Sequence, residues 1–590
     1  MTVRPLRLAL AALSALLASA PAPALADDGD SFRLLLPFEQ DPREVAIGSI
    51  VPDLTMKDLT GATRPLSAAL KDRRAVVLCL TSVTCPLSTR YTPRQKVMAD
   101  EYAARGVLFV LVNVSDTDTL PEMKQQAKML QWPGLSLPDE DRSLRRALSP
   151  RTTTEVLVID AARTLVYRGA VDDQFGVGSA TAEPKRRWLR DALDAVIAGR
   201  PVATPATWSP GCTVDPAPAQ PVDRPDAAVT YANRVARIVR ERCESCHFYG
   251  GPAPFSLENY RAVAGRASMI SAVVRAGLMP PWDAAPPENG APSPWKHDPS
   301  LTADEKRDLL SWLDSERPQG DMSEAPAPIK RVPGWQIGAP DLMMISENVV
   351  LPADGPLVFS RLVVDTRLAQ PMWIAGVEMM ARKRMSLHHA VLFLQTEPIA
   401  DGQSDAEAMR AGALTPILAA GAAHSAAIYP EGSGRLIPAG AKLVIHAWFR
   451  PGGKPMSEKL RPAFKALKQP PALEVRSAPI LADADAPGAA RVGEAMLPAA
   501  ASVFAFTPTP GLRAQGLSLS LKGLAPAPKF TSSRFRAAWP VRYQPLTPWD
   551  LAAETLARFT ATPVEEPAAG SASQTVALLG IVEYTVQRPE

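Results

Sequence analysis

The chain is poor in the residues that most often bind metals, with six histidines and five cysteines in 590 residues. No histidine follows His446 and no cysteine follows Cys246, so an imidazole or thiol site must use a few identifiable positions. The net charge of +3 is small and gives no indication of nucleic acid as a partner. Beyond the N-terminus, no run of 18 uncharged apolar residues occurs, so we expect no transmembrane helix there.

Proline is abundant, with 60 residues, which is roughly twice average usage. Many prolines lie between apolar segments, where they act as stiff spacers. The length of 590 residues predicts several domains of about 100–200 residues each. The expected boundaries are 27–215, a Pro/Ala-rich linker at 216–228, then 229–325, 331–470 and 471–590.

Residues 1–26 are typical of a secretory signal peptide. Arg4 and Arg7 precede an apolar run at Leu8–Leu17, and Ala24-Leu25-Ala26 offers a small-x-small cleavage site. The apolar run is short for a spanning helix, which favours cleavage over a membrane anchor. We therefore expect an exported protein, periplasmic or secreted, in which disulfides can form.

Residues 27–215 alternate between short apolar runs and helical patterns, which predicts an α/β domain with a central sheet. The expected strands are Ala75–Thr81, Val107–Asn113, Glu155–Asp160 and Thr164–Arg168. The expected helices lie around Gln95–Met98, over Pro121–Leu130 and over Arg187–Gly199. Cys79, inside the first apolar strand, is interpreted as an inert core residue.

Cys85 lies at a strand-to-helix turn, in Thr84-Cys85-Pro86-Leu87-Ser88. A thiol at a helix N-terminus feels the positive end of the helix dipole, which favours the thiolate. The order of elements around it resembles the thioredoxin-like superfamily, in its redoxin and peroxiredoxin branch. Ser88 replaces the second cysteine of that family's CxxC motif, and Thr154 replaces its usual cis-proline.

Cys212 ends this domain in Pro210-Gly211-Cys212. The resemblance to multidomain relatives, which close this domain with a similar Gly-Cys, implies that Cys85 and Cys212 form a redox or disulfide pair. The alternative is that either cysteine is unpaired. Three cysteines lie outside the motif described next, so one thiol is left over or joins another chain.

Cys243-Glu244-Ser245-Cys246-His247 is the CxxCH attachment motif of c-type haem. Two cysteines bond the haem covalently, and the histidine becomes an axial iron ligand. A stray redox or zinc motif is the alternative, but an exported chain favours haem c. We expect Cys243, Cys246 and His247 to bind one haem.

The surrounding segment has helical spacing at Tyr231–Arg242 and Arg266–Gly277, and a capped helix with Thr302 as N-cap and Glu305 three residues later. Together with the haem motif, this order resembles a small all-α class I cytochrome c. The resemblance implies a distal methionine ligand, for which Met279 is favoured over Met269. A His/Met pair suits electron transfer. His297 lies in a polar loop and is interpreted as solvated.

Residues 331–590 consist of short apolar runs separated by proline and glycine, which predicts two tandem antiparallel β-sandwiches. The expected strands include two within Val349–Phe359, then Met372–Glu378, His389–Leu394, Lys442–Phe449, Leu517–Leu521 and Thr575–Thr585. The motifs Pro333–Asp341, His388-His389 and Ile437–His446 resemble copper type II, ascorbate-dependent (peptidylglycine hydroxylase-like) monooxygenases, which have paired jelly-roll-like domains.

That resemblance implies that His388 and His389 supply two ligands of a first copper. Trp448 stands at the position of the family's third ligand, and His446 lies two residues earlier. In a strand, His446 shares the face of Trp448 at a displacement of roughly 7 Å. A single copper at His388, His389 and His446 is therefore one possibility, and a metal-free histidine pair in a core or interface is the other. His424 is a further histidine with no motif.

The family's second copper motif, His-x-His-x-Arg-Gly, is replaced here by Thr509-Pro-Gly-Leu-Arg-Ala514. Its late methionine ligand is replaced by leucines within Val576–Tyr584. Because copper(II) prefers imidazole ligands, the sequence argues against a second copper and against two-copper monooxygenation.

The sequence therefore predicts a periplasmic electron-transfer protein that uses haem c, flanked by a redoxin-like domain and a degenerate monooxygenase-like β region. The alternatives are a copper-dependent oxidoreductase fed by the haem, and a scaffold that binds a partner. The redox partner is not identified by the sequence.

Overall fold

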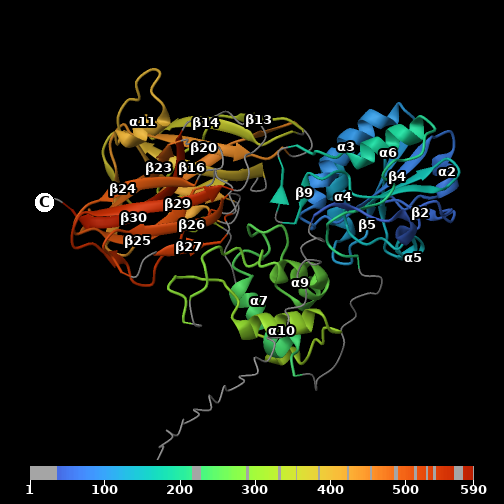
Figure 1. Ribbon diagram of the computed structural model, residues 1–590, viewed down its shortest axis with the longest axis horizontal. Coiled ribbons are helices and arrows are strands. Elements are labelled where there is room, and N and C mark those ends of the chain that lie inside the picture. Colours follow the sequence, from blue (N-terminus) through green and yellow to red (C-terminus); the bar gives the residue numbers. More distant parts are fainter. Residues whose placement is uncertain are drawn as a thin grey trace, which may run out of the picture.

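The computed structural model describes residues 36–177, 179–181, 183–214, 228–287, 291–329, 334–353, 355–382, 386–421, 424–451, 455–483, 490–509, 514–525, 529–533, 535, 540–563 and 576–588. The predicted signal peptide and nearly all of the predicted linker lie outside these ranges. Figure 1 shows an α/β part at the N-terminal end, a helical part in green, and a β-rich part in yellow to red. Within the described residues, no helix is both long and apolar enough to cross a membrane.

A five-stranded sheet organises the N-terminal part, in the order β6-β5-β4-β7-β8. Its strands are β4 (Ala75–Thr81), β5 (Val107–Asn113), β6 (Leu135–Pro138), β7 (Val156–Asp160) and β8 (Leu165–Gly169). The main helices are α3 (Ser88–Ala103), α4 (Leu120–Leu130) and α6 (Trp188–Ile197). Shorter elements are β1 (Phe38–Glu39), η1 (Pro42–Val45), β2 (Thr55–Lys57), β3 (Thr63–Pro65), α2 (Leu66–Leu70), α5 (Ser143–Leu148), β9 (Phe175–Gly176), β10 (Ser179–Ala180) and β11 (Thr207–Trp208).

Strand β4 is buried along its whole length because both faces of the sheet are covered. Successive side chains point to opposite faces, so Val77 and Cys79 join a core that includes Trp188 of α6. Val76 and Leu78 join the core on the other face. The predicted α/β class is confirmed, and Cys79 is the core residue that its apolar strand predicted.

The central helical segment, residues 229–325, contains a π-helical turn η2 (Tyr231–Val235), helices α7 (Ala236–Arg242), α8 (Tyr260–Ala264), α9 (Ala267–Arg275) and α10 (Ala303–Leu313), and a 3-10 turn η4 (Met322–Glu324). The predicted capping box is present, because the Thr302 hydroxyl accepts from the Glu305 amide and the Glu305 carboxylate accepts from the Thr302 amide. In the core, the Tyr260 ring meets the rings of Tyr231 and Trp312 edge-on. The loops between the helices carry the haem motif and Met279.

One of these loops docks onto the β-rich part. Trp295 is 6% exposed, and its ring lies against Tyr543 and Trp549 at centroid distances of 5.5 and 6.0 Å. The amide of Ala285 donates to the Thr531 carbonyl at 2.7 Å. The second β unit therefore takes part of its hydrophobic core from the central helical segment.

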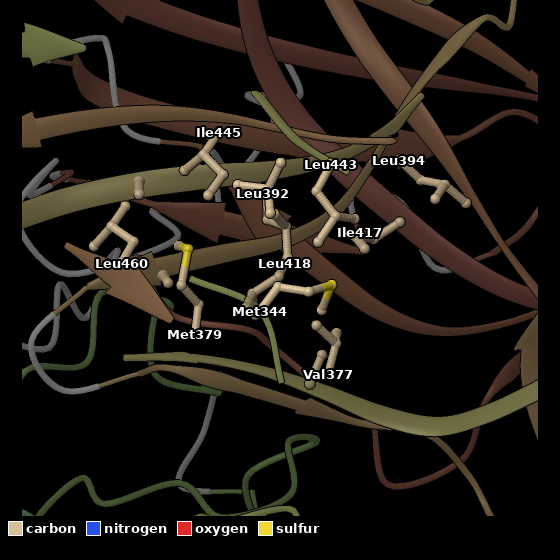
Figure 2. Close-up of a cluster of buried hydrophobic side chains, with 14 of the residues drawn as sticks. Met344, Val377, Met379, Leu392, Leu394, Ile417, Leu418, Leu443, Ile445 and Leu460 are labelled. Carbon is tan, nitrogen blue, oxygen red and sulfur yellow. The ribbon is translucent and has the colours of Figure 1, made fainter. Parts of the chain in front are cut away.

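The first β unit packs two sheets face to face. One sheet has the order β14-β20-β16-β17, and opposite it lie β12, β22, β15 and β19. Figure 2 shows Leu392 and Ile445 from the first sheet near Met379 and Leu460 from the second. The elements are β12 (Leu342–Met343), β13 (Val349–Leu351), β14 (Val358–Asp365), β15 (Met372–Ala381), β16 (Leu387–Gln395), α11 (Asp405–Arg410), β17 (Leu414–Gly421), β18 (Ala426–Ile428), β19 (Ser433–Ile437), β20 (Lys442–Phe449), β21 (Met456–Glu458) and β22 (Leu460–Ala466).

The second β unit is built around two long central strands. Strand β30 pairs with β23 and β25, while β29 pairs with β24 and β26. The parallel pairing of β19 with β23 joins the two units into one hydrogen-bonded sheet. The elements are β23 (Leu473–Asp483), β24 (Arg491–Leu497), β25 (Ser502–Pro508), β26 (Ala514–Leu521), β27 (Phe530–Ser532), β28 (Trp549–Asp550), β29 (Thr555–Pro563) and β30 (Val576–Gln587). The predicted β-rich C-terminal region is confirmed.

Candidate functional site

Cys85 lies between the end of β4 and the start of α3 and is 1% exposed. The backbone amide of Ser88, the first residue of α3, donates to the Cys85 sulfur. The amide of Thr89 donates to the Cys85 carbonyl at 3.0 Å. The thiol therefore occupies the N-terminal end of a 16-residue helix, as the sequence predicted.

The structure brings Cys212 to Cys85 by pairing the end of the domain with the loop before β7. Backbone bonds hold Cys212 in place, because Thr153 donates to the Cys212 carbonyl at 2.9 Å. In return, the Cys212 amide donates to the Thr153 hydroxyl at 3.1 Å. The two side chains share a hydrogen bond, and both cysteines are free thiols.

The two thiols have opposite acidities. Burial alone would raise the pKa of Cys85, but hydrogen bonds from Cys212, Thr153 and the Ser88 amide outweigh it and lower that pKa to about 5. The hydrogen bond to Cys85, together with burial, raises the pKa of Cys212 well above its usual value. At neutral pH the pair is therefore a Cys85 thiolate that accepts a hydrogen bond from the Cys212 thiol. This arrangement is suited to reversible disulfide formation.

The residue that faces Cys85 is Thr153, which the sequence analysis did not identify. Thr154, which stands where the resembled family has its cis-proline, turns its hydroxyl away and donates to the Pro210 carbonyl at 2.6 Å. Ser88 contributes its amide to the sulfur and its hydroxyl to the Thr153 carbonyl at 2.8 Å. A threonine before a strand carries no periodic signal that would have identified Thr153.

Arg266 is a second residue that sequence reasoning missed. It belongs to the central helical segment, is 8% exposed, and donates to the Thr84 hydroxyl at 2.6 Å. Its guanidinium lies over the Phe255 ring, 4.7 Å from the centroid. A contact between residues 182 positions apart leaves no trace in local sequence patterns.

The haem motif forms a tight turn at the end of α7. The Cys243 amide still donates to the Val239 carbonyl, while Cys246 and His247 both donate to the Cys243 carbonyl, at 3.1 and 3.0 Å. The turn therefore gathers the two cysteines and the histidine at one end of the helix. Burial raises the pKa of Cys243 to about 12 and also raises that of Cys246, so both are neutral thiols.

His247 has a defined orientation. Its Nδ1 is 3.0 Å from the Phe255 carbonyl oxygen, and the two rings are 4.7 Å apart. Burial lowers the pKa of His247 to about 4, so the imidazole is neutral. A neutral ring whose Nδ1–H donates to a carbonyl presents the lone pair of Nε2, the arrangement that orients histidine ligands toward a metal. These residues fit a haem ligand set.

Met279 lies in the half-buried loop after α9, where its amide donates to the Val273 carbonyl at 3.2 Å. The alternative methionine, Met269, is buried in the face of α9 that packs into the protein. His297 has a left-handed backbone in its loop, with a φ of 56°.

His388 and His389 lie at the start of β16, where the pairing with β20 shifts register between Leu387 and His389. Adjacent residues in a regular strand point to opposite faces, but this bulge lets the two imidazoles meet, with their Nδ1 atoms 2.6 Å apart. Burial lowers the pKa of His389 to about 3, so this ring is neutral. The buried Nε2 of His389 has no hydrogen-bond partner among the residues that the structure describes.

His446 shares the sheet face of Trp448, as the strand period predicted, but its side chain bonds to another residue. Its Nε2 donates to the Asp405 carboxylate at 2.6 Å. Trp448 is instead the register partner of His389, and its indole stacks on the His389 ring. In the described part of the chain, no three His, Cys, Asp or Glu side chains are grouped for metal binding. His424 is a separate half-buried histidine, and desolvation lowers its pKa to about 4.

Residues 510–513, in the segment where the sequence predicts the loss of a second copper motif, lie outside the described residues. The Thr509 hydroxyl, just before them, donates to the Leu578 carbonyl. The leucines predicted to replace a late methionine ligand lie in β30, which runs from Val576 to Gln587.

Comparisons with known proteins concern the N-terminal part. The Redoxin family model matches residues 46–183. A hypothetical protein from Sinorhizobium meliloti 1021 is 26% identical, with 30% of this chain and 97% of that chain covered and a TM-score of 0.27. An uncharacterized conserved protein from Geobacillus kaustophilus is also 26% identical, with 30% and 95% covered and a TM-score of 0.27.

Peroxidoxin BcpB from Mycobacterium tuberculosis is 20% identical, with 26% of this chain and 95% of that chain covered and a TM-score of 0.21. The comparison with curated proteins finds no match. The family match spans the sheet, α3 and the Cys85 turn. Residues 46–183 therefore form a redoxin domain of the thioredoxin-like class.

Proposed function

We propose that the chain is an exported electron-transfer protein whose working cofactor is one haem c, bound in the central helical segment. The observation that carries this proposal is the His247 imidazole, which is neutral and held through Nδ1 by the Phe255 carbonyl at 3.0 Å. Cys243 and Cys246 lie in the same turn, so the motif keeps the full set of attachment residues. When bound, haem c supplies a one-electron iron(III)/iron(II) couple.

The protein's own residues hold and orient the group. Cys243 and Cys246 would form the two thioether bonds, and His247 would be an iron ligand. Met279 would be the second iron ligand, because its loop follows α9 and a thioether ligand suits a low-spin, electron-transferring iron. Export through the predicted signal peptide takes the chain to the compartment that suits this attachment.

The test is a pyridine-haemochrome assay on the full chain, exported from a bacterial host that attaches c-type haem. One covalent haem per chain and a low-spin spectrum are expected. Changing both Cys243 and Cys246 to Ala should abolish covalent attachment, and Met279→Ala should change the spin state where Met269→Ala does not. An exported, folded chain without a haemochrome signal would overturn the proposal.

A second candidate function is thiol–disulfide redox chemistry in the redoxin domain, which the shared hydrogen bond between Cys85 and Cys212 favours. Oxidation of the pair would release two electrons and one proton, because the Cys85 thiolate and the Cys212 thiol become one disulfide. Equilibration with mixtures of oxidised and reduced glutathione, followed by peptide mapping, should recover Cys85 linked to Cys212. Recovery of both thiols under oxidising mixtures would exclude this function.

The copper alternative requires His446 to leave Asp405 and join the pair formed by His388 and His389. Elemental analysis of the haem-loaded chain tests it. Copper at one or more per chain, lost in His388→Ala, would support a copper-dependent oxidoreductase. Partner binding that survives both Cys85→Ser and loss of haem would instead support a scaffold.

A further inference from the structure

A residue from another part of the chain lies against the loop that carries the thiol site of the redoxin domain. Arg266 directly precedes α9 and is 8% exposed, which is rare for a charged side chain. Its guanidinium donates to the Thr84 hydroxyl at 2.6 Å and to the Ala262 carbonyl at 3.1 Å. Thr84 is the residue immediately before Cys85, so the guanidinium is anchored beside the thiol pair.

The Thr84 hydroxyl has a defined role in this contact. The hydroxyl hydrogen is donated to the Asp118 carboxylate at 3.0 Å. The hydroxyl oxygen is therefore free to accept the hydrogen bond from Arg266. Asp118 is in turn held by the Val83 amide at 2.5 Å and by the Asn113 side chain at 2.9 Å. The loop before Cys85 therefore presents a fixed acceptor to an incoming guanidinium.

The charges that face the thiol pair come from three elements. Arg266 is the positive group from the central helical segment, and Asp118 and Glu122 are the negative groups near it. Among the described residues, no carboxylate lies within ion-pair distance of Arg266. A buried guanidinium without a carboxylate partner is costly, and a nearby thiolate offsets that cost.

The contact belongs to a wider interface between the redoxin domain and the central helical segment. Arg261 donates to the Asp116 carbonyl at 3.1 Å. A Cβ atom added at Gly265 would lie 2.7 Å from the Thr117 methyl group, so the turn before α9 approaches the loop after β5 closely. This close approach places Arg266 in the site.

We propose that Arg266 is a positioning residue of the thiol site, supplied by the central helical segment, and that its guanidinium stabilises the Cys85 thiolate beside Cys212. The redoxin domain alone would then lack part of its own site. This inference rests on Cys85 being the reactive thiol and is independent of the haem. Arg266 acts on the Cys85 thiolate through its positive charge and does not exchange protons. The hydrogen bond to Thr84 orients its guanidinium.

The test is a pH titration of Cys85 in the reduced full chain, read as thiolate absorbance at 240 nm relative to the Cys85→Ser variant. In Arg266→Gln the midpoint should rise by about one pH unit, which is about a tenfold loss of thiolate at pH values well below the midpoint. Arg266→Lys, which keeps the charge, should restore most of the effect. Arg261→Gln, at the same interface but bonded to the Asp116 carbonyl, should leave the midpoint unchanged.

Glutathione equilibration gives a second readout, because loss of the positive charge destabilises the reduced pair. Arg266→Gln should shift the equilibrium about tenfold toward the Cys85–Cys212 disulfide. If Arg266→Gln does not fold, Thr84→Val replaces it as the test. This variant removes the hydroxyl that orients the guanidinium, and it should raise the midpoint by a smaller amount. An unchanged midpoint in every folded variant would overturn the role of Arg266, whereas absence of any Cys85 titration in the unaltered protein would overturn the thiol function itself.

Discussion

The imidazole of His389 lies nearly parallel to the indole of Trp448, with ring centroids 4.3 Å apart and an interplanar angle of 16°. The two residues are register partners in the antiparallel pairing of β16 with β20. The sequence resemblance to copper monooxygenases predicts that Trp448 stands at the position of a third copper ligand. On that prediction, the indole fills the position from which an imidazole would complete a three-histidine site with His388.

Trp448→His should create a copper site where the unaltered protein lacks a third imidazole. The new side chain would project from the register position opposite His389, beside the existing contact with His388. We expect copper(II) affinity at least tenfold tighter than that of the unaltered protein, with nitrogen hyperfine structure in the electron paramagnetic resonance spectrum.

His446→Ala made on the Trp448→His background is the matched control, because His446 donates to Asp405 and should not be a ligand. It should leave the gained affinity in place. No gain of copper in a folded Trp448→His variant, or loss of the gain in the double variant, would contradict the position assigned to Trp448.

Cys85 should titrate as a thiolate at unusually low pH. Its hydrogen bonds lower its pKa from 9.0 to about 5, so reactivity toward a small alkylating agent should already be near its plateau at pH 7. In Cys212→Ala the thiol donor is lost, and the pH midpoint of the alkylation rate should rise.

The same depressed pKa makes reduced-state stability depend on pH. The contribution of the Cys85 thiolate is complete above the usual pKa of 9.0 and is lost as the pH falls through about 5. Urea unfolding of the reduced protein and of Cys85→Ser should therefore diverge as the pH rises from 5 to 9. Parallel pH profiles for the two proteins would contradict the assignment.

Asp405 is the carboxylate that joins α11 to the sheet. Burial alone would raise its pKa, but hydrogen bonds from His446 and Arg361 outweigh burial and hold the pKa well below its usual value. Asp405→Ala leaves His446 without its acceptor and should lower the free energy of unfolding by about 1–3 kcal/mol. Asp401→Ala, at an exposed position nearby, should change it little.

The pH profile distinguishes this bond from simple packing. Because the folded pKa of Asp405 is depressed, its contribution is present above the usual value of 3.8 and is lost on further acidification. The stability difference between the unaltered protein and Asp405→Ala should therefore be constant near neutrality and shrink in acid. A difference that persists unchanged in acid would show that packing alone is responsible.

Local pattern was enough to predict several strands with long buried runs and one capped helix. Strands β4, β5 and β20 run over the residues that their apolar runs predicted, and the capping box at Thr302 marked the start of α10. Strand β23 was not predicted, because Pro479 interrupts its pattern. It nevertheless pairs with β30 along its length, and Pro479 lies opposite Ile581 in that ladder.

The candidate sites divide in the same way. The CxxCH motif and the position of Cys85 could be predicted because their residues are adjacent in sequence or lie at a strand-to-helix turn. Thr153, Arg266 and Asp405 were not, because each acts through a partner that only the tertiary fold brings near. Sequence reasoning therefore proposed candidate site residues from local patterns and missed the groups that the fold brings against them.

Trp295 should be the anchor that holds the central helical segment on the second β unit. Its ring lies against Phe530, Tyr543 and Trp549, and it is 6% exposed. Trp295→Ala removes a large buried aromatic side chain and should lower the free energy of unfolding by about 3–5 kcal/mol. It should also open the loop around it to proteolysis.

Limited proteolysis with mass spectrometry checks the location of that effect. Cleavage should appear first in the loop between α9 and α10, and the redoxin domain should keep its resistance because its own contacts through Arg266 are intact. Tyr249→Ala is the control, since Tyr249 is 90% exposed. If Trp295→Ala instead loosened the redoxin domain first, the central helical segment would be a single rigid connector between the two ends, and the docking of each end would depend on the other.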